Sequence, residues 1–293
     1  MAPREATDDG LAARFWVGSL RRIAQRRSVI LGYHGIGTAQ RRDDVFRLLV
    51  SPAQFTLHLR LLSAAGFRFV TVAELADQLG ADAPPPGLAA ISFDDGMRDN
   101  FTTALPILRR LGIRATVYVA AGLIGGYSPW IATGPAAEIL REDEIRGLAD
   151  EGWEIGAHTM THPDMSVLDY EQCTAEIERG RETLEEITGQ QTLTFAYPFG
   201  RYGPEAIAAV RTAGFRAAVT IGSGSWSRLE LTRAMISAGD PIGLVMLKLT
   251  DRYEPLVSSP PLRFVRRASK HLRSAIANRP HGDDPRPPGP PAY

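Results

Sequence analysis

From about residue 28 onward, the chain alternates short apolar runs with stretches of helical periodicity. Apolar runs bounded by turn residues predict buried strands, whereas apolar positions three and four apart predict helices. The predicted strands cover 28–34, 67–72, 88–93, 113–120, 153–158, 192–198 and 215–221, with a last candidate over 243–249. Strands that alternate with helices indicate a parallel sheet, and seven or eight of them favour a βα barrel over an open sheet.

The boundaries of several helices carry capping signals. Thr71 and Glu74 have the spacing of a capping box and predict the start of a short helix. A long helix is expected to begin after Asp169 and to end at Gly189, because glycine readily takes the left-handed conformation that terminates helices. A helix that starts near residue 100 should be interrupted or kinked at Pro106.

The formal net charge is zero, with 33 basic and 33 acidic residues, so the composition gives no indication of nucleic-acid binding. Both ends of the chain are nevertheless basic, since residues 11–27 and 260–279 contain arginine and lysine but no acid. Leu11, Phe15 and Leu20 fall near one face of a helix in the first of these segments. Such helices either lie on an anionic membrane surface or pack on the barrel and direct arginine into water.

Four segments follow from these patterns. They are a basic N-terminal segment (1–27), a barrel domain (28–255), a basic amphipathic tail (256–279) and a Pro-rich tail expected to be disordered (280–293). Cys173 is alone, so no internal disulfide can form, and no apolar run reaches the ~18 to 20 residues of a membrane span. We expect a cytoplasmic protein, with peripheral membrane association as an alternative.

Polar residues collect where predicted strands end. Asp94 and Asp95 follow "AISF", His158 follows "WEIG" and precedes His162, "YPFG" follows "TLTFA", and His34 ends the first strand. All carboxyl ends of the strands open on one face of a parallel barrel, so these residues can meet in one site.

The pair of histidines in "HTMTH" is a candidate for metal binding. Two imidazoles four positions apart can reach one ion, and a carboxylate would complete a three-ligand set that leaves a position for water. A chance pair of surface histidines is the alternative, which the motifs "FDDG" and "YPFG" at neighbouring strand ends disfavour. Two acids at the end of a buried strand need a nearby cation, and a divalent metal would supply it.

At these residues the chain resembles the polysaccharide deacetylases of carbohydrate esterase family four, which share the NodB homology domain. "SFDDG", "HTMTH" and "AYPFG" are similar, in this order, to the first three motifs of the family, and the resemblance covers roughly residues 28–250. It implies a distorted (β/α)7 barrel and metal-dependent removal of acetyl groups from N-acetylated glycans or glycolipids. The metal would be Zn²⁺, with Co²⁺, Ni²⁺ or Fe²⁺ as other options.

The resemblance also implies roles for individual residues. Asp94 would be the general base, and Asp95, His158 and His162 would be the metal ligands. The motif "AYPFG" would contribute Tyr197 and Phe199 to the oxyanion and substrate region, with the backbone N–H of Phe199 facing the oxyanion.

Two departures from the family pattern concern the acid and base. Ala196 stands where many members have an arginine that orients the base, and Arg233 in "LELTRAMI" is similar to a later motif arginine that could replace it, or is an exposed arginine. No histidine lies between His162 and the tail, although many members have a late general acid there. His34 in "LGYHGIG" is the candidate replacement, since a subgroup carries a similar Y-H motif near its start; a buried structural histidine is the alternative.

Three functions remain open from the sequence. The first is an N-deacetylase of N-acetylhexosamine units in a bacterial surface polysaccharide or its precursor. The second keeps the same metal and base but hydrolyses another amide or an ester. The third is a catalytically weak barrel that binds glycan, prompted by the missing arginine and late histidine.

Overall fold

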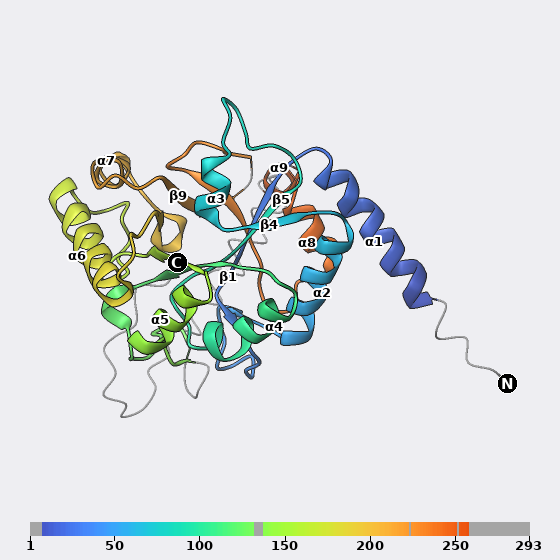
Figure 1. The fold of residues 1–293 in the computed structure, drawn as a ribbon, viewed down its shortest axis with the longest axis horizontal. Helices are drawn as coiled ribbons and strands as arrows, with labels where there is room; N and C mark the ends of the chain where they lie inside the picture. Colours follow the sequence, from blue (N-terminus) through green and yellow to red (C-terminus); the bar gives the residue numbers. More distant parts are fainter. Residues whose placement is uncertain (1–7, 132–136, 223, 251, 258–293) are drawn as a thin grey trace.

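The computed structural model describes residues 8–131, 137–222, 224–250 and 252–257. Seven parallel strands form a closed barrel with helices around it (Figure 1). In chain order these strands are β1 (Val29–Tyr33), β5 (Leu88–Phe93), β6 (Thr116–Val119), β7 (Glu154–Ala157), β8 (Thr194–Ala196), β9 (Ala217–Ile221) and β10 (Leu231–Met235). The ring closes because β1 pairs with both β5 and β10, which confirms the distorted (β/α)7 barrel.

Three further strands lie outside this ring. β4 (Arg68–Val70) pairs with the first half of β5, whereas β6 pairs with its second half. β2 (Gly35–Ile36) and β3 (Leu49–Val50) form a small parallel sheet after the end of β1. The additional strands therefore modify the barrel without interrupting it.

Helices connect the strands and cover the outside of the barrel (Figure 1). They are α1 (Asp8–Ala24), α2 (Pro52–Ala64), α3 (Val72–Asp77), α4 (Leu105–Arg110), α5 (Glu142–Asp150), α6 (Tyr170–Thr188), α7 (Pro204–Thr212), α8 (Ile242–Lys248) and α9 (Tyr253–Val257). A π-helical segment (Asn100–Ala104) precedes α4, and two short 3₁₀ turns follow β6 and β8 (Ala121–Leu123 and Pro198–Gly200). Among the described residues, no helix combines the length and apolar content needed to cross a membrane.

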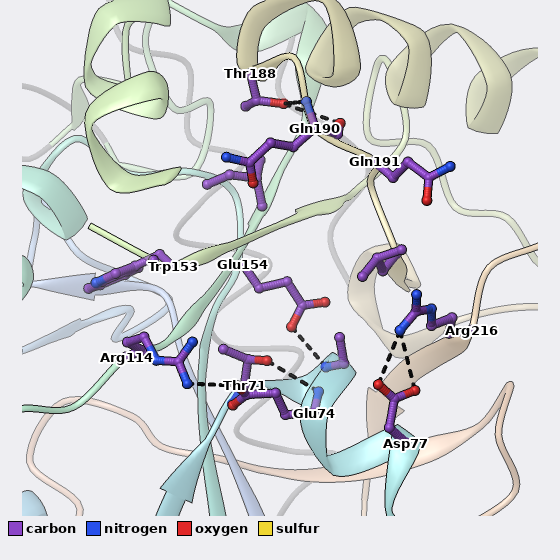
Figure 2. Close-up of a pocket in the computed structure, with 14 residues that line it drawn as sticks. Thr71, Glu74, Asp77, Arg114, Trp153, Glu154, Thr188, Gln190, Gln191 and Arg216 are labelled. Atoms are coloured by element: carbon purple, nitrogen blue, oxygen red, sulfur yellow. Dashed lines mark hydrogen bonds and ion pairs between the residues drawn. The ribbon is translucent and has the colours of Figure 1, made fainter. Parts of the chain in front are cut away.

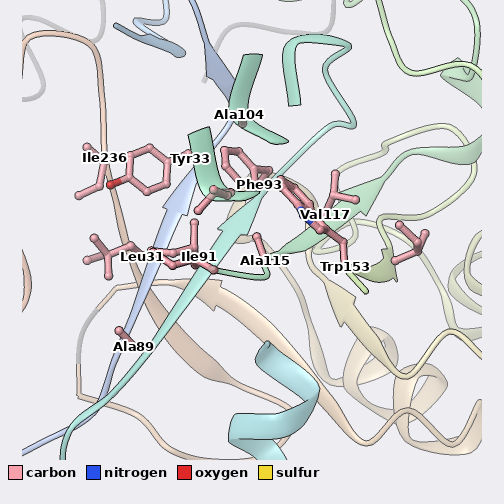
Figure 3. Packing of buried hydrophobic residues seen from close by; sticks show 14 of the residues in the cluster. Leu31, Tyr33, Ala89, Ile91, Phe93, Ala104, Ala115, Val117, Trp153 and Ile236 are labelled. Atoms are coloured by element: carbon pink, nitrogen blue, oxygen red, sulfur yellow. The ribbon is translucent and has the colours of Figure 1, made fainter. Parts of the chain in front are cut away.

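Alternation along each strand separates the barrel interior from its outer face. Ile30, Ala90 and Tyr118 belong to a cluster inside the barrel, which α3 closes at the amino ends of the strands. The intervening residues, such as Leu31 and Phe93, face outward and pack under the helices (Figure 3). A residue two positions beyond an inward-facing one also points inward, and this rule places the side chains of the site.

The predicted helix signals are confirmed in the structure. Thr71 and Glu74 form the capping box, Asp169 caps α6, and Gly189 ends it with φ of 65°. The helix near residue 100 changes from π to α geometry just before Pro106. A proline has no N–H for the helical ladder, so the change of helix type occurs where one hydrogen bond is missing.

The prediction of a strand over 243–249 is wrong, because this segment forms α8. Its buried side chains Val245, Met246 and Leu249 recur at helical spacing, and so short an apolar run does not distinguish helix from strand. The last strand of the ring is instead β10, which contains Arg233.

The basic N-terminal segment includes α1, which packs on the barrel through Trp16, Val17 and Leu20. Phe15 is 62% exposed, so it does not share the packed face with Leu20 as expected. Leu11 lies in α1, but its side chain is outside the described part of the structure, as are residues 258–293 with most of the two predicted tails.

Candidate active and metal site

The carboxyl ends of the barrel strands bring the predicted site residues together. Asp94 and Asp95 follow β5, and His158 follows β7. Tyr33 of β1 pairs in register with Phe93 of β5, which places His34 beside Asp94 at the same level of the barrel. These side chains therefore converge from three strands, as the barrel geometry predicts.

Asp95, His158 and His162 form a buried cluster that could hold a metal ion. Asp95 Oδ1 lies 3.5 Å from His158 Nε2 and 3.3 Å from His162 Nε2, and the two Nε2 atoms are 3.1 Å apart. Ligands about 2.0–2.2 Å from a tetrahedral zinc ion lie about 3.3–3.5 Å from one another, so the donor set fits a divalent ion. The alternative of two surface histidines is wrong, because both are buried.

The surroundings of the cluster keep its groups in the forms that bind metal. Burial acts to raise the pKa of Asp95, but its contacts with His158 and His162 lower it far below its ordinary value. Burial lowers the pKa of His162, which favours the neutral imidazole. His158 Nδ1 lies 2.7 Å from the carbonyl oxygen of Ala196, a contact that directs Nε2 toward Asp95.

Asp94 is held by Arg233 in a buried, two-pronged ion pair. Arg233 Nη1 donates to Asp94 Oδ1 at 2.6 Å, and Nη2 donates to Oδ2 at 2.7 Å. Burial acts to raise the pKa of Asp94, but the charge of Arg233 and then that of His158 outweigh it and lower the pKa. The alternative of an exposed arginine is wrong, since Arg233 is 1% exposed.

Strained backbone is concentrated at this site. Five non-glycine residues among those described have positive φ, and Asp95, Thr159, His162 and Phe199 are four of them. A left-handed conformation is uncommon for such residues and unfavourable for a β-branched threonine. The packing around the site must therefore offset this cost, which is typical of a functional region.

The loop that carries the histidines is fixed against α6. The carboxylate of Glu176 accepts hydrogen bonds from the backbone N–H groups of Met160 and Thr161, at 3.0 and 2.7 Å. Gly180 allows the close approach, because a Cβ there would lie 2.8 Å from the backbone of Thr159. Sequence reasoning missed both contacts of α6, since neither residue belongs to the histidine motif.

His34 is partly exposed, and its backbone carbonyl accepts a hydrogen bond from Asn100 Nδ2 at 2.9 Å. Ile30 points into the barrel, so alternation along β1 also directs His34 inward. Burial acts to raise the pKa of Asp94, and the charges of Arg233, His158 and, to a smaller extent, His34 lower it. The structure thus places His34 at the barrel mouth near the carboxylates.

Residues of the "AYPFG" segment divide between the site and the core. The Phe199 ring meets the His162 ring edge to face, with centroids 4.5 Å apart. Tyr197 points the other way, is 1% exposed and stacks on Tyr202, so the structure does not bring its side chain to the site. Trp130, which the sequence did not single out, lies 4.3 Å from the His162 ring and adds an aromatic wall.

A separate cavity of about 240 Å³ lies at the opposite, amino end of the barrel strands. Figure 2 shows Glu154 among its lining residues, together with Arg114 and Arg216, which pair with Glu74 and Asp77. The predicted site residues lie at the carboxyl ends of the strands, on the other face of the barrel, so this cavity is not the candidate active site.

Comparisons with known proteins agree with this geometry. The polysaccharide deacetylase family model matches residues 81–218. YxkH of Bacillus subtilis (strain 168), a protein assigned to the polysaccharide deacetylases, is 29% identical over 215 residues, which cover 72% of this chain and 71% of YxkH. The chitooligosaccharide deacetylase of Rhizobium leguminosarum bv. trifolii is 26% identical over 162 residues, or 54% of this chain and 69% of that protein.

Among solved structures, the Streptococcus pyogenes deacetylase PplD in complex with acetate has the same fold. It is 25% identical with a TM-score of 0.66, and the match covers 76% of this chain and 98% of PplD. The chain is thus similar to polysaccharide deacetylases, and the family model, the relatives and this structure support a hydrolase of the deacetylase class.

Proposed function

We propose that this chain is a metal-dependent deacetylase that removes N-acetyl groups from N-acetylhexosamine units of a bacterial surface polysaccharide or its precursor. The observation that carries the proposal is the buried pair of Asp94 and Arg233 directly beside the cluster of Asp95, His158 and His162. Each oxygen of Asp94 accepts one hydrogen bond from Arg233 and keeps a lone pair that can take a proton, so a carboxylate held in this orientation suits a general base.

Asp95, His158 and His162 would hold the metal, most simply Zn²⁺, with Co²⁺, Ni²⁺ or Fe²⁺ as other occupants of a carboxylate and two imidazoles. A bound divalent ion would polarise the acetamide carbonyl and lower the pKa of a bound water. The open side of the cluster is bordered by the rings of Trp130 and Phe199, which would exclude bulk water from the reacting atoms.

In this mechanism Asp94 accepts the proton of the attacking water. Its low pKa keeps it ionised, and Arg233 fixes the direction of its oxygens. The oxyanion that develops on the former carbonyl would be met by the backbone N–H of Phe199, whose left-handed conformation sets the orientation of that segment. His34 then donates a proton to the departing amine.

The proposal also covers the type of substrate and the location of the protein in the cell. An N-acetylated glycan or glycolipid is the expected partner, and Tyr33 with His34 would assign the chain to the subgroup with a Y-H motif. Peripheral contact with an anionic membrane is supported by the exposed arginines and Phe15 on α1, and we propose that this contact is made from the cytoplasm.

The test is release of acetate by the full chain after loading with Zn²⁺, Co²⁺ or Ni²⁺. Oligomers of N-acetylglucosamine and their lipid-linked precursors are the substrates, and the O-acetylated sugar and a simple acyl amide are the comparison. We expect turnover of the N-acetylated sugars, lowered about 10²–10⁴-fold in the Asp94→Asn variant. Turnover of the ester or simple amide alone would favour the broader deacylase, and glycan binding without acetate release by the metal-loaded protein would favour the weak barrel.

A further inference from the structure

A line of buried polar side chains runs through the barrel beneath Arg233, and the mechanism above uses none of them. The guanidinium carbon of Arg233 lies over the ring of Tyr118, 5.4 Å from its centroid. Tyr118 is fully buried inside the barrel, where water cannot screen the attraction between a cation and an aromatic face. Tyr118 is thus a cation–π partner of the guanidinium, while Asp94 binds its two terminal nitrogens.

The other contacts of Arg233 are hydrogen bonds that its nitrogens donate. Nη1 also donates to Ser92 Oγ at 3.2 Å, and Nε donates to the carbonyl of Thr220 at 3.5 Å. All of these contacts, including the two with Asp94, lie at the edge of the planar group. A cation held only by in-plane hydrogen bonds can still shift, and the Tyr118 ring adds a contact of a different kind that helps to hold it against Asp94.

The position of the Tyr118 ring is itself determined by its neighbours. Tyr118 of β6 pairs in register with Gly156 of β7, and a Cβ at position 156 would lie 2.4 Å from two ring carbons. Only glycine therefore leaves room for the ring. At its far end, the Tyr118 hydroxyl is 3.1 Å from Thr194 Oγ1, which in turn hydrogen-bonds Glu154.

Glu154 is the last member of this line of polar side chains and lies at the amino ends of the barrel strands. Its Oε2 accepts hydrogen bonds from the backbone N–H of Ala73 at 2.9 Å and from Thr116 Oγ1 at 2.8 Å. The Glu154 carboxylate lies among the residues that line the cavity at the amino ends of the strands (Figure 2). The polar line therefore extends from the amino ends of the strands to Asp94 at the mouth.

We infer that Tyr118 is a positioning residue for the deacetylation, because its ring contacts the Arg233 guanidinium and so helps to hold it where it orients Asp94. Gly156 and Thr194 act through Tyr118 by fixing the ring. This inference rests on the proposed function for its effect on rate, but the contact between Tyr118 and Arg233 can be tested without any reaction. Tyr118 is not a catalytic residue, since Arg233 and Asp94 separate it from the reacting groups.

The first experiment compares kcat and KM per bound metal in substituted enzymes. Tyr118→Leu removes the aromatic face and should lower kcat about tenfold with KM little changed. Tyr118→Phe keeps the face and should restore most of the rate. Gly156→Ala displaces the ring and should lower kcat similarly, and combining it with Tyr118→Leu should add little, because the clash is gone.

A matched control is available elsewhere in the fold. Arg181 lies over the ring of Phe215, 5.2 Å from its centroid, on the outer face of the barrel. Phe215→Leu should cost stability in the same way but leave kcat unchanged. A wild-type kcat in Tyr118→Leu, an equal loss in Phe215→Leu, or a loss confined to KM would each overturn the inference.

The second experiment separates failure of the inference from failure of the proposed function. Urea unfolding of Tyr118→Leu, Arg233→Met and the double variant forms a cycle that needs no substrate. We expect the double variant to lose less stability than the two single losses together. Additive losses would overturn the inference even if acetate is released. A coupled cycle in a protein that releases no acetate would instead support the contact and contradict the proposed function.

Discussion

The two terminal nitrogens of Arg233 donate to the two carboxylate oxygens of Asp94, one to each, at 2.6 and 2.7 Å, although the two residues are 139 positions apart. The pair is buried at the point where β10 and β5 approach the barrel mouth. Many members of the family that the chain resembles have a motif arginine at the position that Ala196 occupies here. In this chain Arg233 comes from another strand and holds Asp94, so the proposed base would keep its orientation with a different residue.

Arg233→Met should therefore lower both the stability of the fold and the rate of the reaction. The substitution leaves Asp94 buried without its partner, which typically destabilises by about 3–5 kcal/mol. It should also lower kcat about a hundredfold or more, because the base loses its orientation. Urea unfolding and acetate release measure the two effects.

Arg233→Lys and Arg216→Met are the informative comparisons. Lysine restores the charge but cannot form the two-pronged contact, so only part of the rate should return. Arg216 pairs with Asp77 at the surface, and its removal should cost less than about 1 kcal/mol. Equal losses for Arg233→Met and Arg216→Met would contradict the importance of the buried pair.

The two neighbouring aspartates should have different phenotypes. Asp94→Asn should keep the bound metal but lose about 10²–10⁴-fold in kcat, because an amide cannot accept the proton. Asp95→Asn and His158→Ala should chiefly lose metal, since each removes a ligand. Metal content per chain, measured by plasma mass spectrometry after dialysis, separates the roles. Full metal occupancy in His158→Ala would exclude the proposed ligand set.

Alternation along the strands would have predicted which side chains enter the site. Ile30 faces the interior, so His34, four positions later, does as well. Ala196 also faces the interior, which turns Tyr197 outward into the core. The strand ends were visible in the sequence, but the assignment of Tyr197 to the substrate region did not take this alternation into account.

Other parts of the site could not be predicted from the pattern of apolar residues. β10 contains a threonine and a charged arginine, so its apolar signal is weak, and α8 drew the prediction of the last strand instead. Trp130 lies in a loop, where spacing carries no information about which ring reaches His162. The contact with Asp94 depends on closure of the barrel, which no local segment encodes.

His34→Gln tests the assignment of the general acid. The variant should fold and bind metal like the wild type, because His34 is partly exposed and is not among the three ligands. It should lose most of kcat with little change in KM, since the amine leaves more readily when protonated. If the alkaline limb of the rate profile reports the acid, the variant should also lack that limb. An unchanged kcat would return His34 to a structural role.

His58 should make the stability of the fold depend on pH. It is buried on α2, with Nδ1 3.2 Å from the Tyr33 hydroxyl, and burial lowers its pKa to about 4. The unfolded chain takes up this proton near pH 6.5, whereas the folded chain does so only near pH 4. Between these values the unfolded state binds more protons, so the contribution of His58 to stability falls as the pH falls.

Asp99 acts in the opposite direction and must be separated from this effect. Burial raises its pKa to about 7, so the folded chain keeps a proton that the unfolded chain has lost, and its contribution falls as the pH rises from about 4 to 7. The His58→Gln variant retains Asp99 and removes only the histidine. The difference in unfolding free energy between wild type and His58→Gln should therefore shift by about 2 kcal/mol against the wild type from pH 7 to pH 5. Urea unfolding at several pH values gives this difference, and a constant value across the range would mean that His58 titrates alike in the folded and unfolded chains.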